Sequence, residues 1–342
     1  MRNEWRIVIA TAIWLFCARI TAQEYGLLPP VDMGKWDIPA GNYSGITPLG
    51  EGLYAVVDDK AETAGFFVFL IEQDSLSGQV VRVENKGFRG DMSMPKGRDA
   101  EGVAYTPNDS LIWISGEADQ QILAQHLSGM NADKALQVPD CFSIDSIMPN
   151  NGFEALCYDT QNGLFWTTTE KALRDDNMLL RLQSFDKKAL QDNSTLLRLQ
   201  SFDKEGHAQE CYGYELDTPE IVRQGKAYAF GAVALCAADN GKLWVMEREL
   251  NVPNRRLNAS TNLKIFEIEP LNGAQPTVKR LIIGFSTRMR LIRPQFANYE
   301  GLCKGIRLAN GRQTWLLISD SQGGYGNKLC RLRDFLRVIV EQ

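Results

Sequence analysis

Three short segments of this chain begin with a glutamate and share one order of residue types. They are Glu101-Gly102-Val103, Glu154-Ala155-Leu156 and Glu300-Gly301-Leu302. Each runs through a turn into a stretch that contains tryptophan and ends on a second acid: Glu117, Glu170 and Asp320. Carboxylates that gather in one place repel one another, and either protonation or a bound hard cation relieves the repulsion. The pattern therefore indicates proton chemistry or a metal centre.

Oxygen donors from carboxylates and amides are the ligands that calcium prefers in proteins. Asn151 and Asn298 stand close to Glu154 and Glu300 and add neutral oxygen donors. We therefore expect a Ca²⁺ site, with these ligands: Glu101, Glu154, Glu300, Asn151 and Asn298. An alternative stays open, in which each glutamate is structural and accepts hydrogen bonds from backbone amides of the next repeat.

The sequence offers little support for a serine hydrolase. Its two histidines, His126 and His207, lie away from the repeated acids, and no G-x-S-x-G motif occurs. A hydrolase would then use metal-assisted attack by water, with a carboxylate as general base and an arginine that neutralises the leaving oxygen. The candidate catalytic residues are Arg98, Glu101, Glu117, Glu170, Arg248 and Asp320.

The elements that must position these acids repeat along the chain. Two weaker copies of the pattern begin at Ser44 and Val233, which brings the number of copies to five. Each unit is long enough for about four short strands, as in a propeller blade. We expect an all-β, single β-propeller of four-stranded blades, whose first strands bring the acids to one central channel. A sixth blade has room in the longer intervals, and a β-sandwich is the rival fold.

Candidate third strands lie at residues 66–71, 121–127, 196–202, 263–268 and 327–332. The segment 24–40 is expected to complete the last blade by pairing with the tail at 328–340, which would remove open sheet edges. LLRLQSFDK occurs at 179–187 and again at 196–204. One copy is expected to form a third strand, and the other to be looped out or helical.

Residues 1–22 read as a cleaved signal peptide, and residues 23–342 as one propeller domain. Arg2 and Arg6 precede an apolar run that is too short to span a membrane. Cys17 follows Phe16, where a lipoprotein signal needs a small residue, so an anchor is disfavoured. We expect a secreted or periplasmic monomer with no membrane span after cleavage. The net charge of −5 argues against a nucleic-acid partner.

Four motifs, in order, resemble the bacterial phytase-like family, "esterase-like activity of phytase". They are RDAEGVAY with LIWISGE, NNGFEALCYD with LFWTTTEKAL, LWVMERE, and NYEGLCKG with LLISDSQGG. The resemblance covers about residues 40–335 and implies an exported propeller-like hydrolase of phosphoesters or carboxylesters. The matching positions are Arg98, Asp99, Glu101, Glu117, Asn151, Glu154, Glu170, Glu247, Arg248, Asn298, Glu300 and Asp320. The duplicated segment and the acid-poor start of the fourth repeat depart from the pattern.

These observations favour an exported, calcium-assisted phosphoesterase or esterase-like hydrolase acting on a small phosphorylated or ester substrate. Two alternatives remain open. One is a calcium-dependent lactonase or carboxylesterase, which needs fewer cations and a more apolar mouth. The other is a non-catalytic binding propeller at the cell surface or in the periplasm, which tryptophan and tyrosine side chains exposed on one rim would favour.

Overall fold

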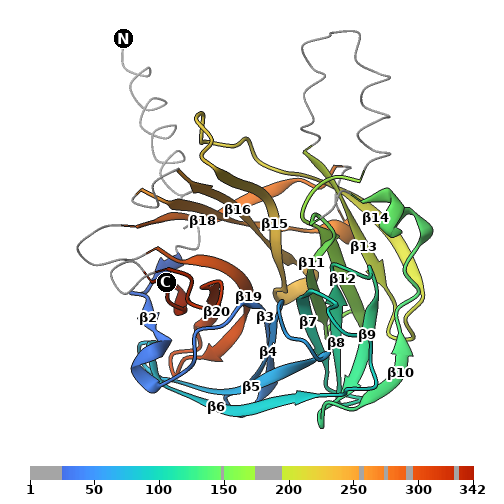
Figure 1. The fold of residues 1–342 in the computed structure, drawn as a ribbon, viewed down its shortest axis with the longest axis horizontal. Coiled ribbons are helices and arrows are strands. Elements are labelled where there is room, and N and C mark those ends of the chain that lie inside the picture. Colours follow the sequence, from blue (N-terminus) through green and yellow to red (C-terminus); the bar gives the residue numbers. More distant parts are fainter. Residues whose placement is uncertain are drawn as a thin grey trace, which may run out of the picture.

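The computed structural model describes residues 25–147, 150–173, 195–253, 258–272, 276–289, 296–326 and 331–342. The signal peptide predicted for residues 1–22 and the first copy of LLRLQSFDK lie outside the described residues. The described chain is all-β and forms a propeller of five blades around one axis (Figure 1). The propeller prediction is confirmed, and the number of blades is five rather than six.

Each of the first four blades is a four-stranded antiparallel meander. Blade one holds β3 (Tyr43–Gly50), β4 (Leu53–Asp58), β5 (Gly65–Gln73) and β6 (Val80–Gly90). Blade two holds β7 (Ala100–Thr106), β8 (Leu111–Gly116), β9 (Ile122–His126) and β10 (Asn131–Ala135). Blade three holds β11 (Phe153–Asp159), β12 (Leu164–Thr169), β13 (Leu196–Phe202) and β14 (Ala208–Glu215). Blade four holds β15 (Ala227–Ala237), β16 (Leu243–Val252), β17 (Ser260–Ile268) and β18 (Lys279–Arg288).

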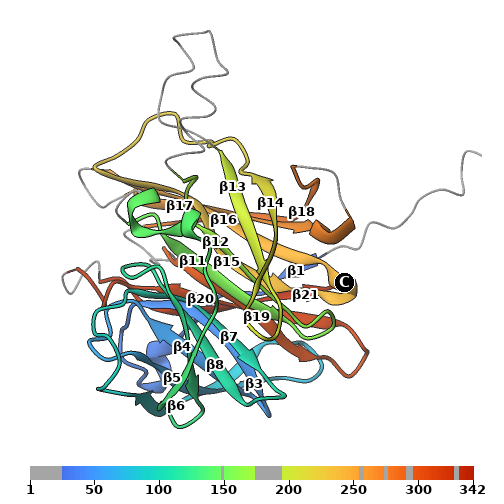
Figure 2. The same ribbon diagram turned by 90° about the vertical axis from the view of Figure 1, so that its right-hand side faces the viewer.

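Blade five joins the two ends of the described chain. It holds β19 (Asn298–Arg307), β20 (Gln313–Asp320), β21 (Phe335–Glu341) and β1 (Tyr25–Leu27), and β2 (Val31–Asp32) also pairs with β21. Tyr25 lies opposite Glu341, and β1 runs beside β21 in Figure 2. The predicted closure by the N-terminal segment is confirmed, and it removes the edge that a ring of strands would otherwise leave exposed.

The third strands agree with the sequence in four blades, and the second copy of LLRLQSFDK supplies β13. The expectation for blade five was wrong: its third strand is β21, not 327–332. Residues 331–334 are loop, and 327–330 lie outside the described part of the chain. The physical reason is burial, because β21 contributes Leu336, Val338 and Ile339 to the core, each at most 1% exposed.

The hydrophobic core lies between neighbouring blades. One cluster joins blades four and five, where Trp244 and Trp315 stack with ring centroids 4.1 Å apart. Another joins blades two and three, where Trp113 meets Phe165 at 5.0 Å. The repeated tryptophans are therefore packing residues that hold one blade against the next. In the described part of the chain, no helix is long and apolar enough to cross a membrane.

Candidate active site

A β-bulge occurs in every innermost strand, near the start of four of them and past the middle of β15. In β11 the ladder passes from Phe153 opposite Thr169 to Ala155 opposite Thr168, so Glu154 has no partner across the strand. A bulge of this kind turns the extra side chain away from the regular alternation. The residues that fall in the bulges are Ser44, Glu101, Glu154, Val233 and Glu300.

The five innermost strands lie nearest the centre of the molecule (Figure 1), and their bulged residues line one channel there. The free volume of this channel is about 10 Å³, roughly what one water molecule needs. Glu101, Glu154 and Glu300 therefore converge at the centre, as the repeat predicted. The fourth repeat contributes Val233 instead of an acid, which agrees with its acid-poor sequence.

The glycine that follows the glutamate in two of the three motifs has a steric reason. A Cβ atom on Gly102 would lie 2.5 Å from the amide nitrogen of Leu156, which belongs to the neighbouring blade. On Gly45, in the matching place of blade one, it would collide with the carbonyl oxygen of Glu101. The bulge aims the glutamate at the axis, and the glycine lets the next innermost strand approach.

The acid ring of the channel consists of Glu101, Glu154 and Glu300. Arg248, near the middle of β16, neutralises part of the negative charge of this ring. Its guanidinium is buried, donates to Glu170 Oε1 at 2.8 Å and also contacts Glu300 Oε1 directly. Asn298 donates its side-chain N–H to the same Glu300 oxygen at 2.8 Å. Burial alone would lower the pKa of Arg248, but the charges of Glu300 and Glu170 raise it, so the guanidinium stays charged.

Glu101 and Glu154 differ from Glu300 in having no such partner. They are 7% and 9% exposed, and neither carboxylate forms a hydrogen bond or ion pair with another described residue. Burial raises the pKa of Glu101, and the charge of Glu154 raises it further. Burial likewise raises the pKa of Glu154, and Glu170 adds to the rise while Arg248 opposes it. These two side chains are buried acids without a counter-charge of their own.

Glu101 also belongs to a second acid group, which lies toward blade one. Its ligand oxygen and those of Asp59 and Asp99 all lie within 4.8 Å of one another. Within the described ranges, this is the group of three acids that is compact enough to share one ion. Neither aspartate was predicted as a ligand, although Asp59 ends the second strand of its repeat as Glu117 does in the next. That shared position is the signal that could have found it.

The other predicted residues have structural partners. Arg98 is buried, with its Nε 2.6 Å from Asp119 Oδ2 and one terminal nitrogen 2.8 Å from the carbonyl of Gln121. Glu117 accepts the amide N–H of Gly152, which follows Asn151, at 2.9 Å. The carboxylate of Asp320 accepts the backbone N–H of Gln322 at 2.6 Å. The structural role considered for the glutamates thus fits Glu117, whereas Glu101 and Glu154 accept no amide hydrogen bond from the described chain.

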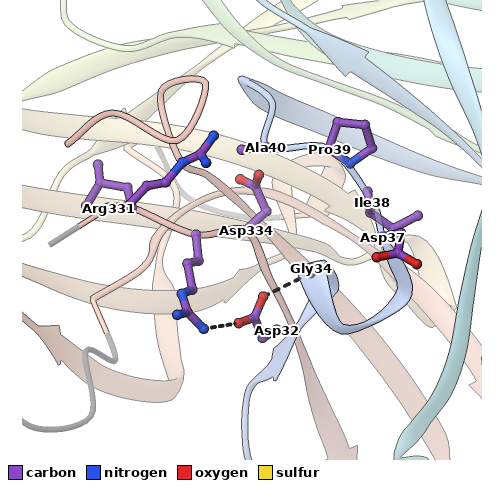
Figure 3. A pocket seen from close by; sticks show the side chains of 10 residues that line it. Asp32, Gly34, Asp37, Ile38, Pro39, Ala40, Arg331 and Asp334 are labelled. Atoms are coloured by element: carbon purple, nitrogen blue, oxygen red, sulfur yellow. Dashed lines mark hydrogen bonds and ion pairs between the residues drawn. The ribbon is translucent and has the colours of Figure 1, made fainter. Parts of the chain in front are cut away.

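A wider cavity of about 510 Å³ lies between residues 32–40 and 331–334 (Figure 3). Asp334 lines it and is 4% exposed. One carboxylate oxygen accepts the Gly41 N–H at 2.9 Å and the Ser321 hydroxyl at 2.8 Å, while the other is buried with no partner among the described residues. Burial raises the pKa of Asp334 to about 7.

This raised pKa predicts a pH dependence of stability. The pKa of an unfolded aspartate is about 3.9, so folding binds a proton between about pH 4 and pH 7, and the free energy of unfolding falls as the pH rises through that window. We expect Asp334→Asn, which resembles the protonated side chain, to flatten the dependence. Urea unfolding of both proteins at about pH 5 and about pH 8 measures it. Equal changes in wild type and variant would show that Asp334 does not titrate in this window.

Comparison with known proteins adds a family and a set of distant folds. A family model described as "Phytase-like: Esterase-like activity of phytase" matches residues 38–322. Among solved structures, a streptogramin B lyase is 13% identical over 93% of this chain and 98% of its own, with a TM-score of 0.39. A luciferin-regenerating enzyme is 13% identical over 92% and 97%, with a TM-score of 0.44. The periplasmic gluconolactonase PpgL of Pseudomonas aeruginosa is 14% identical over 85% and 70%, with a TM-score of 0.34. Similarities this low say nothing about the reaction of this chain, and no curated protein sequence matches it.

Proposed function

This chain belongs to the phytase-like family, and from that membership and the acid ring we propose that it is an exported hydrolase of ester bonds. It acts on small phosphorylated or ester substrates at the mouth of the central channel, with the help of a hard divalent cation. Calcium is the cation that a donor set made only of oxygens favours.

One observation carries this proposal: Glu101 and Glu154 are more than nine-tenths buried and have no hydrogen-bond or ion-pair partner in the described chain, and Glu154 also lies within reach of the charge of Arg248. A carboxylate held out of water without a counter-charge destabilises a fold. Such an arrangement is typical of functional sites, where acids with a raised pKa take part in proton transfer or ligand binding.

The substrate must bind at the mouth rather than inside the channel, because the channel has room for roughly one water molecule. Side chains that border the mouth are partly exposed: Glu300 at 13%, Asp59 at 15% and Asp99 at 24%. These three acids outnumber the two cations that pair with them, Arg248 and Lys60, so the excess negative charge repels an anionic substrate. A phosphoester therefore needs a cation at this mouth, and the proposal makes hydrolysis metal-dependent.

We assign roles by the partners that each side chain has. Glu154, buried and unpaired, is the general base and takes the proton of the attacking water on its carboxylate. Arg248 offsets negative charge on the reacting group, and Glu170 and Glu300 hold its guanidinium in place. Glu101 and the neighbouring acids would hold the cation, which would supply Lewis-acid polarisation of the ester.

The non-catalytic binding propeller has less support. It called for tryptophan and tyrosine side chains exposed on one rim. In the described ranges Tyr325 is 59% exposed, but one side chain does not make a rim, and the repeated tryptophans, Trp113, Trp166, Trp244 and Trp315, are each at most 5% exposed. These tryptophans pack between the blades instead.

An assay of the mature protein tests the proposal. The substrates are p-nitrophenyl phosphate, bis(p-nitrophenyl) phosphate, p-nitrophenyl acetate and a lactone, each with added Ca²⁺, with EDTA, and with Ca²⁺ restored. We expect turnover of at least one ester, a fall of about tenfold or more in EDTA, and recovery with Ca²⁺. The preferred ester also separates a phosphoesterase from a lactonase or carboxylesterase. Absence of turnover on all four substrates with Ca²⁺ present would contradict a hydrolase.

A further inference from the structure

We infer that Asp59, Asp99 and Glu101 form a divalent-cation site between blades one and two, and that the ammonium group of Lys60 competes with the ion for it. This inference rests on the proposed function only for the role of the ion in turnover. Binding itself can be measured without a substrate.

The three acids come from three different local structures. Asp59 directly follows β4, and its backbone N–H donates to the carbonyl of Asn42 at 3.1 Å. Asp99 precedes β7 with a positive φ of 56°, and its carbonyl accepts the N–H of Glu117 at 2.8 Å. Glu101 occupies the bulge of β7. Backbone hydrogen bonds hold Asp59 and Asp99, and the strand β7 holds Glu101, so the donors are placed before an ion arrives.

The spacing of the donors suits calcium. Calcium–oxygen distances of 2.3–2.6 Å put oxygens on opposite sides of the ion roughly 5 Å apart. The ligand oxygens of the three acids lie within 4.8 Å of one another. One ion can therefore contact all three without movement of the backbone, and water or substrate oxygens complete its coordination.

A separate observation is that some carboxylate oxygens of this group have no partner in the described chain. Only 7% of the surface of Glu101 is exposed. Its carboxylate has no hydrogen-bond or ion-pair partner among the described residues, and it lies with the carboxylates of Asp59 and Asp99. Asp59 Oδ1 is also buried without a hydrogen-bond partner in the described structure. Leaving such atoms unsatisfied costs free energy, and an ion bound among them removes that cost.

Lys60 already brings a positive charge to the outer side of the group. Its Nζ lies 2.7 Å from Asp59 Oδ2 and 2.7 Å from Asp99 Oδ1, but it has no contact with Glu101. The Lys60 side chain is 61% exposed, whereas Asp59 and Asp99 are 15% and 24% exposed, so an ion bound among the acids would replace the positive charge that Lys60 gives them. Lys60 can therefore leave for solvent at little cost when an ion binds, and its charge sets how strongly the site holds that ion.

Calorimetric titration of the metal-stripped mature protein with CaCl₂ tests the inference, with MgCl₂ as a second titrant. We expect one bound Ca²⁺ per chain, binding about tenfold tighter in Lys60→Met, and binding weaker by about tenfold or more in Asp99→Asn. Lys86→Met is the matched control, because Lys86 forms a similar exposed pair with Glu84 on β6 at 2.7 Å. It should bind Ca²⁺ as wild type does.

Each departure from this pattern is informative. Absence of Ca²⁺ binding in both wild type and Lys60→Met overturns the site, and so does wild-type affinity in a folded Asp99→Asn. Unchanged or weaker binding in Lys60→Met overturns the competition. Ca²⁺ binding without ester hydrolysis would support the cation site and contradict the proposed hydrolase. Hydrolysis without Ca²⁺ binding would support a hydrolase and contradict the cation site.

Discussion

Replacing Arg248 by methionine should remove ester hydrolysis and lower the free energy of unfolding by about 3–5 kcal/mol, the usual cost of breaking a buried ion pair. Glu170 and Glu300 would be left buried near the axis with no positive charge beside them. The melting temperature should fall by about 10 °C. Thermal unfolding and an esterase assay on the same preparation measure both effects.

A control and a rescue separate the two roles of Arg248. Arg280→Met removes an arginine of the same blade that pairs with Glu267 at 2.7 Å but is 50% exposed, so it should change little. Adding Glu170→Gln and Glu300→Gln to the Arg248→Met variant removes the unpaired charges and should restore part of the stability but none of the activity. Full activity in folded Arg248→Met would exclude the arginine from the reaction.

Glu154→Gln should lower the rate by roughly 10²-fold, at the lower end of what a general base contributes, without a loss of stability. The reason is that its carboxylate is buried with no partner in the described chain, so the neutral amide avoids the cost of an isolated charge. Because burial raises the pKa of Glu154 and the base must be deprotonated, the wild-type rate should rise with pH through that raised pKa. The pH–rate profile and urea unfolding of both proteins measure these effects.

Glu267→Gln is the matched contrast. Glu267 is also buried, at 8% exposure, but Lys242 and Arg280 pair with it on β17, away from the channel. We expect this variant to lose stability and keep its activity, the opposite of Glu154→Gln. A Glu154→Gln variant with the wild-type rate and pH profile would show that another group is the base.

Much of the architecture could be predicted from the sequence because it is encoded locally. The acid and the tryptophan recur in one order in all three motifs, and glycine follows the acid in two of them. Each has a local reason: the bulge, the core between blades, and the close approach of the next strand. The same repetition predicted that Glu101, Glu154 and Glu300 meet at one axis. It failed for the third strand of blade five, which is the more apolar β21 and not 327–332.

The sequence by itself determined the ring of blades and which acids face its centre, because period, turns and burial pattern depend on neighbours along the chain. Only the tertiary structure decided which charges meet: Arg248 with Glu170 and Glu300, Arg98 with Asp119, and Asp59 with Asp99 and Glu101. These pairings join residues of different blades or of separate strands. They depend on register, bulges and side-chain direction to within a few ångströms, which a linear pattern of residue types does not specify.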